Sequence, residues 1–108
     1  MDADKYQKEA MAFLNPGIEE KDVLLNALMG LSAESGEALD LLKKHLFQGH
    51  ELNEEDLIKE LGDVAWYLAE ASYSLEVDLS EVLEKNIAKL KDRFPNGFEA
   101  EKSMHRKD

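Results

Sequence analysis

The stretch AESGEALDLL, Ala33 to Leu42, has a helix-forming composition but carries a glycine one residue before its second glutamate. Glycine inside a helix costs about 1 kcal/mol relative to alanine, so its presence needs a reason. The stretch KELGDVAWYL, Lys59 to Leu68, repeats the skeleton of Glu, any residue, Gly, an acidic residue and an apolar run. This repetition within one short chain indicates that the pattern has a structural or functional role.

Apolar residues recur every three or four positions along the chain, and β-branched residues are scarce, which predicts four helices and no strand. We expect helices at about 4–14, 22–45 or 22–48, 54–75 and 79–93. The boundaries rest on NPG at 15–17 with a linker at 18–21, on Gly49 as a helix stop, on Asn53 as an N-cap and on DLSE at 78–81 as a capping box. The predicted fold class is all-α, a small helical bundle of about four helices.

The two central helices each carry a wide apolar stripe that we expect to face inward. A single bundle of this size cannot cover so much apolar surface, so we expect oligomerisation to complete the fold. The stripes consist of Leu24, Leu28, Leu31, Leu39, Leu42 and Leu46 on the second helix, and of Leu57, Leu61, Val64, Ala65, Leu68 and Leu75 on the third.

The chain has 108 residues, which we interpret as a single domain, 1–108, with residues 96–108 as an extended tail. Its 24 acidic against 13 basic residues give a net charge of -11, which argues against binding to nucleic acid. There is no cysteine, the first ten residues lack the apolar core of a signal peptide, and no apolar run reaches the roughly 20 residues of a membrane span. We therefore expect a cytoplasmic protein that does not enter a membrane.

Two pairs of acidic residues lie in the middle of expected helices, away from the ends where acids act as caps. They are Glu34 with Glu37, and Glu60 with Asp63. At about 100° per residue, both pairs lie on the same side of their apolar stripes, so antiparallel packing directs them to one flank of a helical hairpin. Four close carboxylates repel unless neutralised, and an all-oxygen set suits magnesium, calcium or manganese. The alternative is a solvated surface paired with Lys43, Lys44 or Lys59.

The fourth helix offers charges of the opposite sign. Lys85, Lys89 and Arg93 recur every four residues, which places them on one helix face, and Asn86 lies beside them. Such a row of cations and an amide can bind phosphate oxygens, although a solvated face is the alternative.

Other residues of the repeated stretches have predicted roles in packing or in binding. Gly36 and Gly62 fall on the flank opposite the acids, where they permit the close approach of another helix from this chain or from a second copy. Tyr67 shares the flank of the carboxylates and can stack on a base, whereas for Trp66 we favour packing.

The segments GLSAESGEALDLLKKHLFQGHEL, LIKELGDVAWYLAEAS and LSEVLEKNIAKLKDRFPNGF resemble the MazG-like all-α nucleoside triphosphate pyrophosphohydrolases, over about residues 25–106. The resemblance implies that magnesium is held by the ExxE and ExxD pairs. It also implies that the segment from Lys85 to Arg93 contacts the phosphates or sugar of the substrate. Assembly as a dimer or a dimer of dimers is implied as well, so the expected partner is a homodimer or homotetramer.

The leading hypothesis is a magnesium-dependent hydrolase, with manganese as a possible substitute, that converts (deoxy)nucleoside triphosphates to the monophosphate and pyrophosphate. Glu37 is the candidate that activates water, because it and Asp63 project farthest from the apolar stripes. Two alternatives remain open: a phosphoribosyl-ATP or dCTP pyrophosphatase, and a non-catalytic helical module that binds a nucleotide or a protein.

Overall fold

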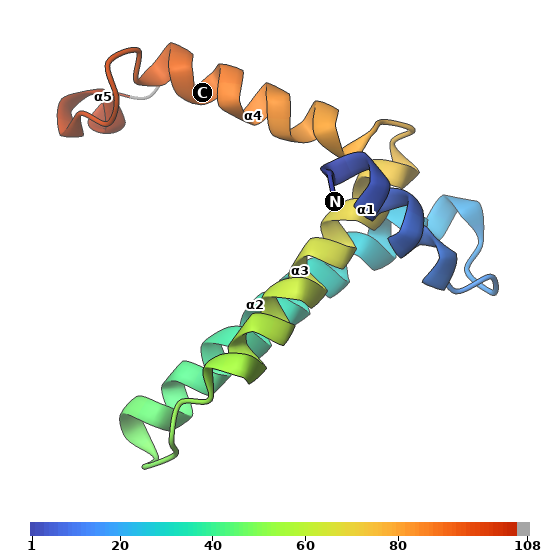
Figure 1. Cartoon of the computed structure of the whole chain (residues 1–108), viewed down its shortest axis with the longest axis horizontal. Coiled ribbons are helices and arrows are strands. Elements are labelled where there is room, and N and C mark those ends of the chain that lie inside the picture. The colour runs from blue at the N-terminus through green and yellow to red at the C-terminus, as the bar shows by residue number, and fades with distance from the viewer. Residues whose placement is uncertain (106–108) are drawn as a thin grey trace.

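The computed structural model describes residues 1–105, and this part of the chain is helical without a strand (Figure 1). The helices are α1 (Ala3–Ala10), α2 (Val23–Phe47), α3 (Glu54–Ser74), α4 (Leu79–Arg93) and α5 (Ala100–Met104). Short 3-10 turns at Met11–Phe13 and Glu20–Asp22 follow α1 and precede α2. The predicted all-α class is confirmed. No helix within residues 1–105 has the length and apolar character that a membrane crossing requires.

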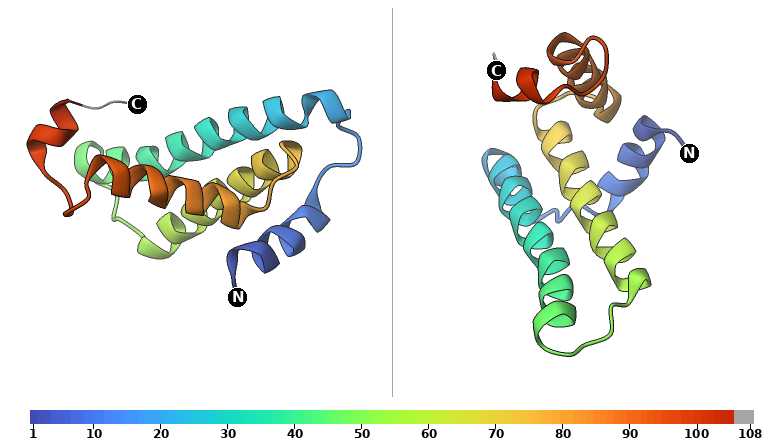
Figure 2. Two further views of the ribbon diagram at one scale, coloured as in Figure 1. Left: turned by 90° about the horizontal axis from the view of Figure 1, so that it is seen from above. Right: turned by 90° about the vertical axis from the view of Figure 1, so that its left-hand side faces the viewer.

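An antiparallel hairpin of α2 and α3 forms the long body of the molecule (Figures 1 and 2). The helices meet through small residues: Ala27 is fully buried, and a Cβ added to Gly30 would lie 2.2 Å from Cε1 of Tyr67. Beyond this contact, Asn26 Nδ2 donates to both carboxylate oxygens of the fully buried Glu70, at 3.0 Å each. Small side chains therefore determine which faces of the two helices meet.

The leucine stripes do not lie inside this hairpin. Leu28, Leu39 and Leu46 of α2 are 51%, 66% and 59% exposed, and Leu61 of α3 is exposed as well. The prediction that the stripes face inward is therefore wrong for these leucines in the single chain, whereas Leu68 of the α3 stripe packs against the buried cluster. Gly30 leaves room for the ring of Tyr67, so this face of α2, rather than the face with Leu28 and Leu39, meets α3.

The first helix closes the open end of the hairpin, where α3 ends and α4 begins. Ala10, Ala69 and Leu79 form a buried cluster, against which Trp66 and Tyr6 pack. The indole Nε1 of Trp66 donates to the backbone oxygen of Ala10 at 2.9 Å. The prediction that Trp66 is a packing residue is confirmed.

The central helix ends follow their sequence signals. Asn53 caps α3 by accepting a hydrogen bond from the Asp56 N–H at 3.3 Å. After α2, Gly49 has a φ of 73°, a left-handed conformation that suits glycine, and the His50 N–H returns to the Lys44 oxygen at 3.2 Å. Both predictions are confirmed.

The predicted capping box at the start of α4 is wrong. The side chain of Asp78 makes no hydrogen bond to the helix, although this residue does occupy the N-cap position. The N–H groups of the first turn instead bond to side chains of α1, which lies against this corner of the molecule.

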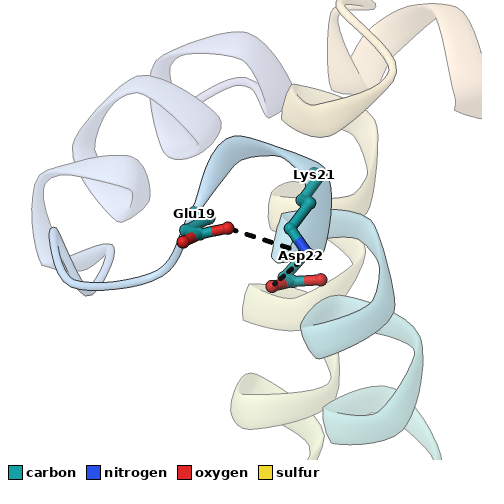
Figure 3. A network of polar contacts seen from close by, with 3 residues as sticks. All are labelled: Glu19, Lys21 and Asp22. Carbon is teal, nitrogen blue, oxygen red and sulfur yellow. Dashed lines mark ion pairs between the residues drawn. The ribbon is translucent and has the colours of Figure 1, made fainter.

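The linker before α2 contains a small network on the surface (Figure 3). Lys21 Nζ lies 3.7 Å from Glu19 Oε2 and 3.9 Å from Asp22 Oδ2. All three side chains are exposed, so the pairs contribute little to stability.

The fourth helix leaves the corner as an arm that diverges from the hairpin (Figure 1). Its apolar residues Leu83 and Ile87 are exposed. The radius of gyration is 16.9 Å, whereas a compact chain of this length has about 13 Å. The single chain is therefore open, and completion of the fold by other copies stays a prediction.

The tail differs from its prediction. Residues 96–108 were expected to be extended, but Ala100–Met104 form the short helix α5, because Ala, Glu, Lys and Met are good helix formers. The last three positions of the predicted tail, 106–108, lie outside the described residues.

The glycines of the repeated stretches have no close neighbour in this chain. Among the described residues, nothing lies within 4 Å of a Cβ added to Gly36 or Gly62. The predicted close approach of another helix of the same chain is therefore wrong, and an approach by a second copy stays a prediction.

We predict opposite effects for two alanine substitutions in α2. Gly30→Ala should destabilise the protein by about 1–3 kcal/mol, because the new methyl group overlaps the ring of Tyr67. Gly36→Ala should stabilise it by about 0.5–1 kcal/mol, because the methyl group enters open space and alanine favours the helix. Urea unfolding followed by circular dichroism measures both changes. Equal stability of Gly30→Ala and the unmodified protein would exclude the close contact with Tyr67.

Candidate metal centre

Three carboxylates gather where α2 and α3 face each other. Glu34 and Glu37 come from α2 and Glu60 comes from α3, and each offers one oxygen such that these atoms all lie within 4.8 Å of one another. The three-residue spacing puts Glu34 and Glu37 on adjacent turns of the same helix face. The structure thus brings together three of the four predicted carboxylates.

Asp63 does not join this group. Its side chain is exposed one turn along α3 from Glu60, and the three-carboxylate cluster is formed without it. It nevertheless lies close enough for its charge to raise the pKa values of Glu34 and Tyr67. The predicted convergence of Glu34, Glu37 and Glu60 is observed, whereas the contribution of Asp63, one helical turn from Glu60, stays a prediction.

The cluster combines buried and accessible oxygens. Glu34 Oε2 and Glu60 Oε2 are buried and have no hydrogen-bond donor among the described residues, whereas Glu37 is exposed. When Glu34 is protonated it can donate this proton to Glu60, and this hydrogen bond raises the pKa of Glu34 to about 7; burial and the charges of Glu37 and Asp63 act in the same direction. A proton shared between the two acids, or a cation, is therefore needed to offset the repulsion of this group.

A divalent cation fits this donor set. All ligand atoms are carboxylate oxygens, which favour hard ions such as magnesium or manganese. The nearby lysines do not neutralise the cluster, because Lys43 and Lys44 pair with Asp40 at 3.4 and 2.9 Å. The alternative of an acidic surface paired with these two lysines is therefore not observed.

Tyr67 lies next to the cluster on the hairpin contact. Its ring covers Gly30 and meets Trp66 edge to face, with centroids 5.0 Å apart. Burial raises the pKa of the Tyr67 hydroxyl, and the negative charges of Glu34 and Glu70 raise it further. Tyr67 is thus half-buried at the side of the carboxylate cluster, and whether it stacks on a base stays a prediction.

Gly30, Asn26 and Glu70 were not among the residues predicted for the site. A signal was present, because Glu70 lies three residues after Tyr67 and seven after Asp63, on the same helix face. Asn26 and Gly30 precede Glu34 at similar spacing on α2. The polar face of the hairpin therefore extends beyond the carboxylate cluster.

The single chain does not bring the predicted phosphate-binding residues to the carboxylates. Lys85, Asn86 and Lys89 are exposed on α4, which leads away from the hairpin (Figure 1). The guanidinium of Arg93, at the end of this arm, lies 5.7 Å from the centroid of the Phe94 ring. Their role in binding substrate stays a prediction.

Comparison with known proteins gives two findings. The family model of the MazG nucleotide pyrophosphohydrolase domain matches residues 22–98. The "Gene 37 protein" of Mycobacterium phage L5 is 41% identical over 73 residues, and the match covers 64% of each chain. The chain thus spans just under two thirds of the length of this relative. No solved structure matches significantly.

We predict that the metal-free protein loses stability as the pH rises from about 4.5 to about 7. The folded state holds the Glu34 proton with a pKa of about 7 against an ordinary value of 4.5, so it binds more protons than the unfolded state in this interval and is favoured at its acidic end. Glu34→Gln should weaken this pH dependence of Tm, measured in chelator. Glu9→Gln, on the exposed side of α1, is the matched control.

Added manganese should raise the Tm of the unmodified protein at neutral pH and should raise that of Glu34→Gln much less, since the variant lacks one ligand. Identical pH and manganese responses of Glu34→Gln and Glu9→Gln would contradict the proposed cluster.

Proposed function

The chain belongs to the MazG nucleotide pyrophosphohydrolase family, and on this premise we propose that it hydrolyses (deoxy)nucleoside triphosphates to the monophosphate and pyrophosphate with magnesium as cofactor. Manganese is the proposed substitute for magnesium. We further propose that it acts in the cytoplasm, where it would control the size of the nucleotide pool or remove damaged nucleotides from it.

One observation carries the proposal. Glu34, Glu37 and Glu60 converge although their charges repel, and two of their oxygens are buried without a donor. The arrangement is electrostatically unfavourable unless a proton shared by Glu34 and Glu60 or a cation offsets the repulsion. A site that receives a divalent cation accounts for it.

The residues of the cluster have different proposed roles. Glu34 and Glu60, whose buried oxygens have little freedom, would hold the cation together with Glu37, and Asp63 would complete the set from the border. When bound, the cation would offset the charge of the triphosphate and of the departing pyrophosphate. The exposed Glu37 would accept a proton from a water molecule. The oxygen of this water would attack a phosphorus atom at the junction of the α- and β-phosphates. The bond from that phosphorus to the bridging oxygen would then break, which releases the monophosphate and pyrophosphate.

The phosphates would be held by the cations of α4. Lys85, Lys89 and Arg93 with Asn86 present donors along the arm, and Tyr67 would flank the base. Because the arm diverges from the hairpin of its own chain (Figure 1), we propose that it reaches a site in a homodimer or homotetramer. The exposed stripes on α2 and α3 would form the interface between copies.

A panel of triphosphates, with analysis of the released products, tests the activity and its substrate. We expect pyrophosphate and a monophosphate, with turnover that requires magnesium. Turnover of phosphoribosyl-ATP or dCTP in preference to the rest of the panel would indicate that the protein is a phosphoribosyl-ATP or dCTP pyrophosphatase instead. Nucleotide binding without magnesium and without hydrolysis, seen by calorimetry, would indicate a non-catalytic module.

We predict that Glu37→Gln lowers kcat by about 100-fold or more, because the amide cannot accept the proton of the attacking water. The assay measures pyrophosphate release at saturating magnesium, so that weaker metal binding does not explain the loss. Glu9→Gln is the control for an equal change in charge. Full metal-dependent turnover by Glu37→Gln would exclude the proposed role.

The proposed interface predicts that Leu39→Glu dissociates the oligomer. Leu39 is 66% exposed in the single chain, so a charge there leaves the chain folded but disrupts an apolar contact between copies. Met29→Glu is the control, because Met29 is 64% exposed and lies about 100° round the helix from Leu28. Analytical ultracentrifugation should show a smaller species for Leu39→Glu only. A monomeric unmodified protein would exclude the interface.

A further inference from the structure

The start of α4 takes its N-terminal cap from α1. A helix leaves its first N–H groups without partners inside the helix, and Asp78, at the N-cap position, does not bond to them through its side chain. Gln7 Oε1 accepts from the Leu79 N–H at 2.8 Å, and Asp4 Oδ1 accepts from the Ser80 N–H at 2.9 Å. Asp4 Oδ2 also accepts from the Ser80 hydroxyl at 2.7 Å.

Gln7 joins three parts of the chain at this corner. Its side-chain amide donates to the backbone oxygens of Ala69, in α3, and of Val77, in the connection, at 3.4 and 3.1 Å. Together with its bond to Leu79, these contacts leave Gln7 only 8% exposed. Asp4 and Gln7 are three residues apart, so one face of α1 supplies both caps.

Both α1 and α3 give the corner further support. Leu79 packs in the buried cluster with Ala10 and Ala69, and Trp66 donates to the Ala10 oxygen. Farther along, the arm leads away from the other helices (Figure 1). Its direction is therefore determined close to its first turn.

A small change in the tilt of α4 at this corner produces a large displacement of the residues farther along the arm. Lys89 lies about 15 Å from the start of α4, at about 1.5 Å per residue, so a tilt of about 10° moves it by roughly 2.6 Å. Displacements of this size are sufficient to weaken a contact with phosphate.

We infer that α1 positions the arm, with Asp4 and Gln7 as positioning residues for the cations of α4. The inference rests on the proposed function, because it assigns those cations to the substrate. α1 lies outside residues 22–98, the segment that the family model matches, so the position of a matched helix depends on residues that precede the matched domain.

Asp4→Ala tests the inference, with Asp2→Ala as a matched control. Both substitutions remove one exposed aspartate from the start of the chain, but Asp2 caps α1 itself, through the Lys5 N–H at 2.8 Å, and does not bond to α4. Asp4→Ala should raise KM for the triphosphate by about tenfold, with a smaller change in kcat and unchanged manganese affinity without nucleotide. Asp4→Asn, which keeps an acceptor for the Ser80 N–H, should restore most of the affinity.

A distance measurement tests the arm without relying on hydrolysis. The chain has no cysteine, so Gln48→Cys at the hairpin tip and Lys91→Cys on α4 allow two spin labels to be attached. Labelled protein is diluted with unlabelled protein, so that only distances within one chain are recorded. Asp4→Ala should broaden or shift the distance distribution, and Asp2→Ala should not.

The outcomes separate this inference from the proposed function. An unchanged distance distribution in Asp4→Ala overturns the inference, whatever the kinetics. A changed distribution with the same KM as Asp2→Ala overturns the positioning role in the reaction. If the unmodified protein hydrolyses no triphosphate, the proposed function fails, and the distance measurement still decides whether α1 directs the arm.

Discussion

The close contact of α2 and α3 at Ala27 and Gly30 is the constraint on which the other features depend. A side chain at Gly30 would overlap the ring of Tyr67, so glycine at this position lets the ring lie against the backbone of α2. Ala27, three residues earlier, is fully buried on the same helix. The same packing of α2 on α3 brings Glu34 and Glu60 together and leaves Leu28 and Leu39 exposed.

The contact therefore imposes an electrostatic cost on the hairpin. Glu34 and Glu60 have buried oxygens that no donor among the described residues satisfies, and the pKa of Glu34 rises to about 7 in response. Groups that oppose folding in this way persist where function requires them, because the rest of the structure supplies enough stability. Here the stabilising contacts that offset this electrostatic cost lie at the packed end of the hairpin, where Trp66 and Ala69 meet α1.

Periodicity and helix-end signals were sufficient to predict the helices and most of the carboxylate cluster. Asn53 and Gly49 marked helix ends correctly because such signals act through neighbouring residues. The rotation of the hairpin was not predictable from hydrophobicity, since a stripe of leucines shows which face avoids water but not which neighbour covers it. The cap of α4 was missed for a similar reason: Asp4 and Ser80 are 76 positions apart, and no local pattern joins them.

The orientation of α2 in the hairpin also separates two of its surfaces, the apolar stripe and the side that carries Glu37. At about 100° per residue, the exposed Leu28 and Leu39 lie roughly 160° and 180° round α2 from Gly30, on the far side of the helix from the contact with α3. Glu37, the exposed member of the cluster, lies on the side of that contact rather than on the stripe. A partner that covers the leucines therefore need not cover Glu37. The proposed active site can therefore remain open to substrate while a second copy covers the apolar stripe, as the proposed oligomer requires.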